Sequence, residues 1–280
     1  MATLVPETQT ETAQQRSAVM AGAPVPTAVQ MHRNIDCSEA EWAARRELAA
    51  CYRVFDLNGW SESIYNHISL RVPGEDAAFL INPYGLLYSE VTASNLVKID
   101  IDGKTLDGSP FPVNKAGFTQ HAYFHRHLAD AHAICHVHTT ATMAVCSTED
   151  GLQPINFYAC NLVDQMGYHD FEGVTVRPEE GERLLANLGD KRILMLRNHG
   201  PVVLAKTIPQ MFVTQWVLQR ACEIQVETLA MGVPVRRVPP EVVAVHQRDI
   251  GQVASAGPMG AADFAAFVRR IDKLDRSWRD

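Results

Sequence analysis

Two histidines one residue apart, at the end of an apolar run, constrain the fold of this chain more than any other feature. The run at residues 131–138 reads AHAICHVH. In a β-strand the side chains alternate between faces, so His136 and His138 point one way while Cys135 and Val137 point the other. Neutral imidazoles on a buried face need hydrogen-bond partners or a metal ion. We therefore predict a buried strand with Cys135 in the core, and two candidate metal ligands whose alternative is a pair of hydrogen-bonded core histidines.

A third candidate ligand lies in a predicted turn. The segment RILMLRNHGPVVLA contains two apolar runs separated by Asn198, His199 and Gly200, which indicates a strand, a tight turn and a second strand. We expect Gly200 to take a positive φ in this turn. His199 is either an ordinary turn residue or a ligand that projects into a cleft. Three histidines from two strand ends would leave coordination positions open, as in catalytic metal sites.

Hydrophobic periodicity divides the rest of the chain into helices and strands. Ser38 and Glu41 form a capping box before an amphipathic helix that Asn58 and Gly59 end. Between residues 64 and 102, short apolar runs alternate with turns, as in antiparallel strands with one solvated face. Further helices are predicted over residues 115–130, 139–146 and 263–278. These elements indicate one α/β domain with a mostly antiparallel sheet.

A long helix is predicted from about Pro209 to Gly232. Its apolar side consists of four residues at helical spacing: Val213, Val217, Ala221 and Ile224. Four polar residues form a stripe that we expect to face solvent: Gln215, Gln219, Glu223 and Glu227.

Composition limits the domain plan and the partners. The chain has 280 residues, 46% of them hydrophobic, and a formal charge of −7 without a long basic run. This charge argues against nucleic acid and anionic membrane surfaces as partners, and no apolar run approaches the roughly 20 residues of a membrane span. We expect a disordered tail over residues 1–35, a domain over 36–235, and a C-terminal extended arm with a short helix over 236–280. Six scattered cysteines predict free thiols in a reducing cytoplasm.

The other histidines are weaker candidates. His125 and His127 flank Arg126 on the helix predicted over residues 115–130, and we expect both to face solvent. His121 lies four residues after Gly117 on the same helix. It is either a helix-packing residue or an additional group that reaches the metal site.

Several stretches, in this order, resemble the class II aldolase and adducin head family: NHISLRVPG, FLINPYGLLYSEVTASNLVKID, VNKAGFTQH, HVHTTAT, LRNHGPVV and ACEIQVETLA. The resemblance extends from about residue 42 to residue 235. It implies a three-layer α/β/α fold with a central, mostly antiparallel sheet, commonly assembled as a homotetramer. It also implies that His136, His138 and His199 bind a divalent metal ion, most commonly zinc, with manganese, iron, cobalt and nickel as alternatives.

The resemblance also shows where this chain departs from the sugar-phosphate aldolases of the family. In those enzymes a Glu precedes the two strand histidines and serves as metal ligand and proton shuttle, and Gly117 stands at the matching position here. Tyr84 replaces a small residue of the phosphate-binding loops, which argues against a phosphosugar substrate. Tyr158 matches a catalytic Tyr that those aldolases bring from a neighbouring subunit.

These matches lead to three hypotheses. The first is a metal-dependent lyase that cleaves a small hydroxy- or oxo-acid by decarboxylation or retro-aldol cleavage, with His121 or Tyr158 delivering a proton. Decarboxylation is the more compatible with Gly117, because it needs no base to start the cleavage. The second is a non-enzymatic, adducin-like assembly module, and the third is an iron-dependent oxygenase on the same scaffold.

Overall fold

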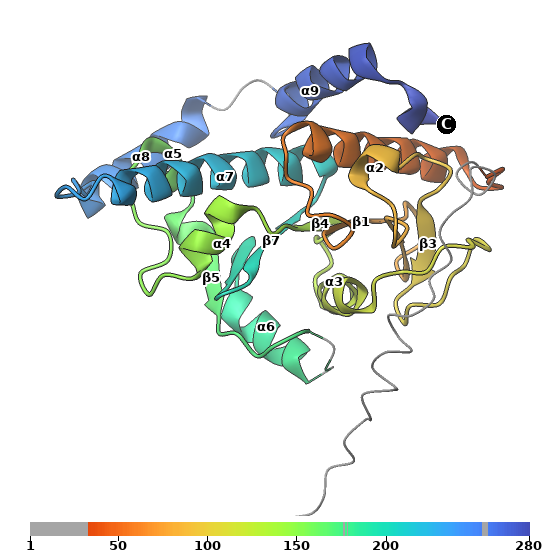
Figure 1. Cartoon of the computed structure of the whole chain (residues 1–280), viewed down its shortest axis with the longest axis horizontal. Coiled ribbons are helices and arrows are strands. Elements are labelled where there is room, and N and C mark those ends of the chain that lie inside the picture. The colour runs from red at the N-terminus through yellow and green to blue at the C-terminus, as the bar shows by residue number, and fades with distance from the viewer. Residues whose placement is uncertain (1–32, 176, 178, 254–256) are drawn as a thin grey trace, which may run out of the picture.

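A seven-stranded sheet forms the middle layer of the computed structural model, which describes residues 33–280 except 176, 178 and 254–256 (Figure 1). The strand order is β3-β2-β1-β4-β7-β6-β5, and every neighbouring pair is antiparallel except β5 and β6. The mostly antiparallel sheet predicted from the sequence is therefore confirmed. The strands are β1 (His67–Arg71), β2 (Ala78–Ile81), β3 (Val97–Asp100), β4 (Ala133–His136), β5 (Met166–His169), β6 (Ile193–Leu196) and β7 (Gly200–Ala205).

Helices cover both faces of this sheet, which confirms the three-layer α/β/α architecture (Figure 1). One face carries α2 (Glu39–Leu57), α4 (Thr140–Cys146) and α7 (Ile208–Ala230), and the other carries α3 (Lys115–His127) and α6 (Glu180–Leu188). Successive residues of β4 reach different layers, because Ile134 packs in the core beneath α6 while Cys135 packs in the core beneath α2 and α7. The buried strand and the core position of Cys135 are as predicted.

The remaining helices are short or lie outside these layers. They are α5 (Phe157–Cys160), α8 (Pro240–Val253), α9 (Ala261–Leu274), and the 3₁₀ turns η2 (Tyr88–Glu90), η3 (Val163–Gln165) and η4 (Ser277–Arg279). No helix in the described part of the chain combines the length and apolar character that crossing a bilayer requires.

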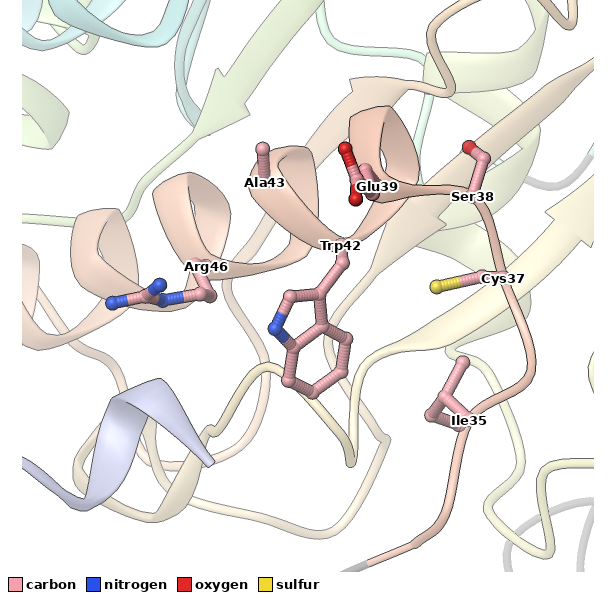
Figure 2. Close-up of a pocket in the computed structure, with 7 residues that line it drawn as sticks. All are labelled: Ile35, Cys37, Ser38, Glu39, Trp42, Ala43 and Arg46. Atoms are coloured by element: carbon pink, nitrogen blue, oxygen red, sulfur yellow. The ribbon is translucent and has the colours of Figure 1, made fainter.

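The first helix begins at the predicted residue but with only half of the predicted capping box, because the Glu41 carboxylate pairs with Arg45 and Lys98. The Ser38 hydroxyl accepts a hydrogen bond from the Glu41 amide, and Gly59 takes a positive φ of 70° just after the helix ends. A cavity of about 400 Å³ lies beside the first turns of α2 (Figure 2). It contains no histidine and is lined by Ile35, Cys37, Ser38, Glu39, Trp42, Ala43 and Arg46.

The solvated polar stripe predicted for α7 is wrong at its N-terminal half. Gln215 is fully buried and Gln219 is only 6% exposed, whereas Val217, predicted to be buried, is half-buried. Gln219 is held inside because its amide oxygen accepts from the Thr139 hydroxyl and its amide nitrogen donates to Glu223. A hydrogen bond from Thr139, distant in the sequence, therefore holds Gln219 inward, whereas Gln215 is buried with no partner for its Nε2 among the described residues.

The C-terminal segment also differs from the prediction. Residues 240–253 form helix α8 rather than an extended arm. Pro240 occupies the first position, where its missing amide hydrogen costs nothing, and Val243 is buried. The His246 ring lies 4.8 Å from the Phe157 ring of α5, so tertiary packing supports a helix that the local sequence did not indicate. The predicted last helix is confirmed as α9, whose Phe264 packs on Phe212 of α7.

The predicted disordered tail lies outside the described residues up to residue 32. Its last three residues are described, and there the prediction is wrong at Arg33. The Arg33 guanidinium donates to the carbonyl oxygens of Ser94 and Leu96 and to the Asp107 carboxylate. Arg33 is therefore fixed to the domain by a partly buried ion pair with Asp107.

Candidate metal centre

The three predicted ligands come together at the C-terminal end of β4, the central strand of the sheet. β4 pairs with β7 in a register that sets His136 opposite Val202, and the turn before β7 carries His199. In this turn Asn198, not Gly200 as predicted, takes a positive φ, of 57°. Gly200 is needed for a different reason, because a Cβ built there would lie 2.6 Å from the Val137 carbonyl oxygen. This close approach holds the His199 turn against the segment that carries His136 and His138.

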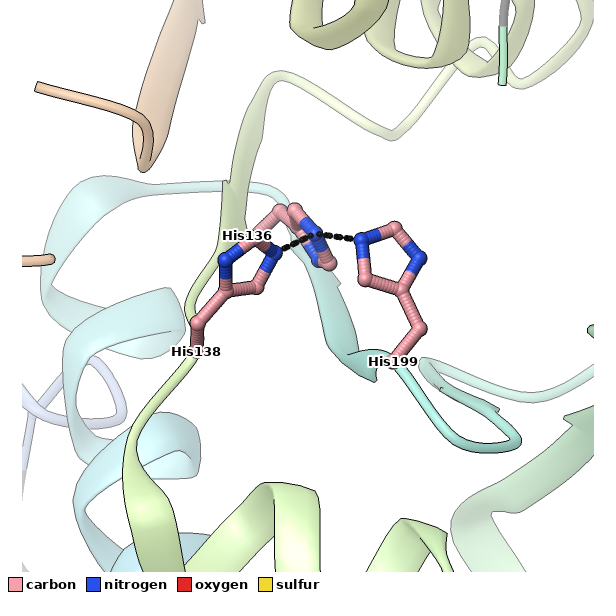
Figure 3. Close-up of side chains that lie close together, drawn as sticks. All are labelled: His136, His138 and His199. Carbon is pink, nitrogen blue, oxygen red and sulfur yellow. Dashed lines mark hydrogen bonds between the residues drawn. The ribbon is translucent and has the colours of Figure 1, made fainter. Parts of the chain in front are cut away.

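The three imidazoles point toward one another (Figure 3). Nε2 of His136 lies 2.8 Å from Nε2 of His138 and 3.3 Å from Nε2 of His199. One ring nitrogen from each residue lies within 4.8 Å of the others, and no other such group of potential metal-binding side chains occurs in the described residues. His136 is buried, while His138 and His199 are half-buried, so the cluster is accessible from one side.

The protonation state of these rings suits a cation. Nδ1 of His136 lies 2.9 Å from the Pro201 carbonyl oxygen, which only accepts hydrogen bonds, so Nδ1 carries the hydrogen and Nε2 is left with a lone pair. Burial, and then the neighbouring His199 and His138, lower the pKa of His136. Burial and His138 lower the pKa of His199 to about 4. Neutral imidazoles with convergent lone pairs and a carbonyl behind one ring fit a divalent metal ion.

A cavity of about 640 Å³ opens over this cluster. Among the described residues that line it, none is Lys or Arg. Tyr84 lines the cavity, at the place where the sequence predicted that a bulky residue would hinder phosphate binding. The lining residues are Glu62, Tyr65, His67, Tyr84, Asn114, Gly117, Gln120, His136, His138, Phe171, Gly173, Val174, Thr175, Asn198 and His199.

His67 is a site residue that the sequence analysis missed. It begins β1, is paired in register with His136 of β4, and its ring centroid lies 5.2 Å from that of His136. The missed signal was the pair His67 and Ser69, two polar residues spaced to share one face of a buried strand. On α3, a Cβ at Gly117 would lie only 2.2 Å from Cδ2 of His67. The ring of His67 therefore occupies the space beside Gly117.

Behind His67, a chain of hydrogen bonds runs through the interior, away from the cavity. Nδ1 of His67 lies 2.9 Å from Nε2 of His121, and Nδ1 of His121 lies 2.7 Å from the Ser69 hydroxyl. The same hydroxyl lies 2.8 Å from Nε2 of His125, whose Nδ1 lies 2.8 Å from the Ala131 carbonyl oxygen. We call these four side chains, His67, His121, Ser69 and His125, the histidine relay.

The relay corrects one prediction and restricts another. His125 does not face solvent as expected but is buried, because Ser69 and Ala131 satisfy both of its ring nitrogens. His127 is exposed, as predicted. His121 is fully buried and does not line the cavity, so it contacts the site only through His67. Burial, followed by the neighbouring histidines, lowers the pKa of both His67 and His121.

Tyr158 lies away from the cavity of its own chain. It belongs to α5, packs against Trp216 of α7 with ring centroids 5.7 Å apart, and does not line the cavity. Within one chain it is therefore not brought together with the three histidines. Its neighbour Phe157 is 59% exposed.

Comparison with known proteins gives consistent matches. The family model described as Class II Aldolase and Adducin N-terminal domain matches residues 46–226. A protein of Caulobacter vibrioides named for aldolase class 2 is 40% identical over 244 residues, which cover 87% of this chain and 94% of the relative. Alpha-adducin of Mus musculus is 42% identical over 254 residues, which cover 86% of this chain and 34% of the adducin. The crystal structure of an aldolase II superfamily protein from Pseudomonas syringae superposes with a TM-score of 0.81 at 38% identity, and covers 87% of this chain and 98% of that protein.

Proposed function

Because the chain belongs to the class II aldolase and adducin N-terminal family, we propose that it is a divalent-metal-dependent lyase that breaks a carbon–carbon bond in a small hydroxy- or oxo-acid. The observation that carries this proposal is the convergence of three ring nitrogens, from His136, His138 and His199, at the floor of a cavity. We assign the site to a domain over residues 36–235.

The chemistry divides between the cation and the chain. When bound, a divalent cation polarises a substrate carbonyl as a Lewis acid and stabilises the negative charge that builds as a carbon–carbon bond breaks. The Pro201 carbonyl orients His136, and Gly200 permits the close turn that positions His199. Phe171 and Val174 add apolar side chains to the lining, and both are more than half exposed. Zinc suits three imidazoles best, and manganese, iron, cobalt and nickel are the alternatives.

The lining of the cavity supports a non-phosphorylated substrate. A phosphate dianion is usually held by Arg, Lys or a backbone-rich loop. Among the described residues, the lining carries no cation, and it includes the carboxylate of Glu62 and the large ring of Tyr84. A small acid, which brings one negative charge, would fit this lining better than the phosphate dianion of a phosphosugar.

The test combines elemental analysis with a substrate panel. Purified protein should contain about one transition metal ion per chain. It should also release carbon dioxide or an aldehyde from at least one hydroxy- or oxo-acid. His136→Ala should lose both the metal and the turnover, whereas His127→Ala, which changes an exposed histidine of α3, should lose neither. A folded native protein that binds no divalent metal and cleaves no acid would contradict the lyase proposal.

The similarity to alpha-adducin supports a second candidate, a non-enzymatic assembly module. It predicts that metal binding, if any, serves no turnover, and that the His136→Ala variant assembles like the wild type. The panel described above separates the two candidates.

Assembly is also part of the lyase proposal. We propose a cytoplasmic homotetramer in which Tyr158 acts at the site of a neighbouring subunit, because Tyr158 does not line the cavity of its own chain. The six cysteines, all free in the structure, suit a reducing compartment.

The oligomeric state is measurable by size-exclusion chromatography with light scattering. Wild-type protein should elute as a tetramer, and Phe157→Asp should dissociate it, because a carboxylate beside Tyr158 would be buried at the interface. Leu274→Asp, which changes a 70% exposed residue of α9, is the control and should remain tetrameric. A monomeric wild-type protein would rule out the shared site.

A further inference from the structure

The relay orients its hydrogen bonds in one direction only. The Ala131 carbonyl accepts but never donates, so Nδ1 of His125 carries the hydrogen, and Nε2 of the neutral ring is an acceptor. The Ser69 hydroxyl therefore donates to His125, which leaves its oxygen to accept from Nδ1 of His121. Nε2 of His121 then accepts from Nδ1 of His67. Each hydrogen bond fixes the direction of the next, and the series ends with a lone pair on Nε2 of His67.

The rings of the relay are neutral for a geometric reason. His121 and Ser69 are fully buried, and His67 and His125 are at most 4% exposed. Their hydrogen-bond partners are one another and a backbone carbonyl, and none of these partners is a carboxylate. A buried imidazolium without a counter-charge is strongly disfavoured.

Nε2 of His67 lies beside Gly117, and both residues line the cavity. Nδ1 faces His121, which does not line the cavity, whereas His67 does. The opposite edge lies over Gly117, where an ideal Cβ would be 2.5 Å from Nε2. The absent side chain at Gly117 thus makes room for a basic nitrogen beside the metal-binding cluster. His67 is not part of that cluster, which in the described residues contains only His136, His138 and His199.

We propose that His67 is the catalytic base of this site, and that Ser69, His121 and His125 are positioning residues that hold its Nε2 lone pair toward the substrate. This inference rests on the proposed lyase function and specifies its reaction. A base is needed for retro-aldol cleavage but not for the bond-breaking step of decarboxylation. It therefore reverses the preference for decarboxylation that Gly117 suggested from sequence alone, and points to a 4-hydroxy-2-oxo acid as the class of substrate.

In this reaction one residue, His67, both removes a proton from the substrate and returns it to the product. Nε2 of His67 takes the proton of the C4 hydroxyl, and the bond between C3 and C4 breaks as C4 becomes an aldehyde. The electron pair of that bond passes to C3 and the C2 carbonyl of the departing enolate. Nε2 then returns the proton to C3, so the products are an aldehyde and a shorter 2-oxo acid, and the base is regenerated.

The decisive measurement is the tautomer of each relay histidine, because it does not depend on turnover. Nitrogen-15 NMR of histidine-labelled protein, loaded with zinc, distinguishes a protonated from a bare ring nitrogen. We expect Nδ1–H and a bare Nε2 on His67, His121 and His125. Ser69→Ala should interrupt the relay and mix the tautomers of His121 and His67. Ser94→Ala, which removes a buried serine hydroxyl outside the relay, should leave them unchanged. A wild-type His67 that carries its hydrogen on Nε2 would overturn the proposal.

Kinetics on a 4-hydroxy-2-oxo acid complete the test. His67→Asn should retain one metal ion per chain and lose about 10²–10⁴-fold in kcat. Ser69→Ala should lose about 10–100-fold in kcat with its metal content unchanged, and Ser94→Ala should match the wild type. Loss of metal from His67→Asn would make His67 a ligand and refute the role of base. If no acid in the panel is cleaved, the lyase function itself fails, whereas an active enzyme with Nε2–H on His67 overturns this inference alone.

Discussion

Gly200 and Gly117 show how single residues shape the site by what they lack. A Cβ at Gly200 would press on the Val137 carbonyl oxygen, and a Cβ at Gly117 would overlap the ring of His67. Neither glycine takes a positive φ, so both are required for space and not for backbone freedom. From sequence, Gly200 was assigned a turn conformation that Asn198 adopts instead.

At this scale we predict that Gly200→Ala weakens metal binding. The added methyl group must displace the backbone between His136 and His138, and such overpacking costs about 1–3 kcal/mol. Isothermal titration with zinc and urea denaturation measure the two effects. Gly251→Ala in α8 is the matched control, because its Cβ would meet nothing within 4 Å, and it should change the unfolding free energy by less than about 1 kcal/mol. Equal zinc affinities for Gly200→Ala and the wild type would contradict the prediction.

Among the elements, α2 is held to the sheet by buried charge as well as by apolar packing. Arg45 is fully buried, pairs with Glu41 on its own helix, and donates to the Asp107 carboxylate at 2.9 Å. Arg33 binds the same carboxylate. Burial alone would raise the pKa of Asp107, but hydrogen bonds from Arg33 and Arg45 hold it below its usual value. The charged pairs fix α2 to the segment that follows β3.

Asp107→Asn should lower the unfolding free energy by about 3–5 kcal/mol, because it leaves the partly buried Arg33 guanidinium without a counter-charge and the buried Arg45 guanidinium with Glu41 alone. Urea denaturation at neutral pH measures this loss. Asp102→Asn breaks an ion pair with Arg126 in which both side chains are at least half exposed, so it should cost no more than about 1 kcal/mol. Similar losses in the two variants would show that burial of the Asp107 pair is not what matters.

Across the whole molecule, the histidine relay links stability to pH. Burial is the main cause that lowers the pKa of His125 to about 3, the charge of Arg71 adds to it, and the Ala131 carbonyl opposes it. The unfolded histidine has a pKa of about 6.5, so below that pH the unfolded state binds more protons than the folded state. The contribution of neutral His125 to the free energy of unfolding is therefore fully present above about pH 6.5 and declines as the pH falls toward 3.

The expected slope is about 1.4 kcal/mol per pH unit for His125, or about 2 kcal/mol between pH 6.5 and pH 5. Burial also lowers the pKa of His121 and His67, so these two rings add to the loss of stability at low pH. Urea denaturation across this range should show a shallower pH dependence for His125→Asn than for the wild type, while His127→Asn keeps the wild-type slope. Parallel curves for all three proteins would contradict the assignment of His125 as a buried neutral ring.

Local pattern in the sequence was enough to predict the sheet, its mostly antiparallel pairing and the core position of Cys135. It offered His136, His138 and His199 only as candidate ligands, which the family resemblance then joined into one set. Strand alternation and turn residues act within a few positions of each other, and they place His136, His138 and His199 at strand ends without knowledge of the partners. Resemblance to the family then supplied the three-layer architecture.

Only the tertiary structure decided which polar groups are buried. Gln219 faces inward because its amide oxygen accepts a hydrogen bond from Thr139. His125 faces inward because Ser69 and Ala131 satisfy both of its ring nitrogens. Helix α8 forms where its His246 packs on Phe157 of α5. Gln219 and His125 each have a hydrogen-bond partner distant in the sequence, and periodicity carries no record of those partners. His67, the proposed base, was identified when β1 was paired with β4 and packed against α3, although the spacing of His67 and Ser69 in the sequence already indicated a shared face.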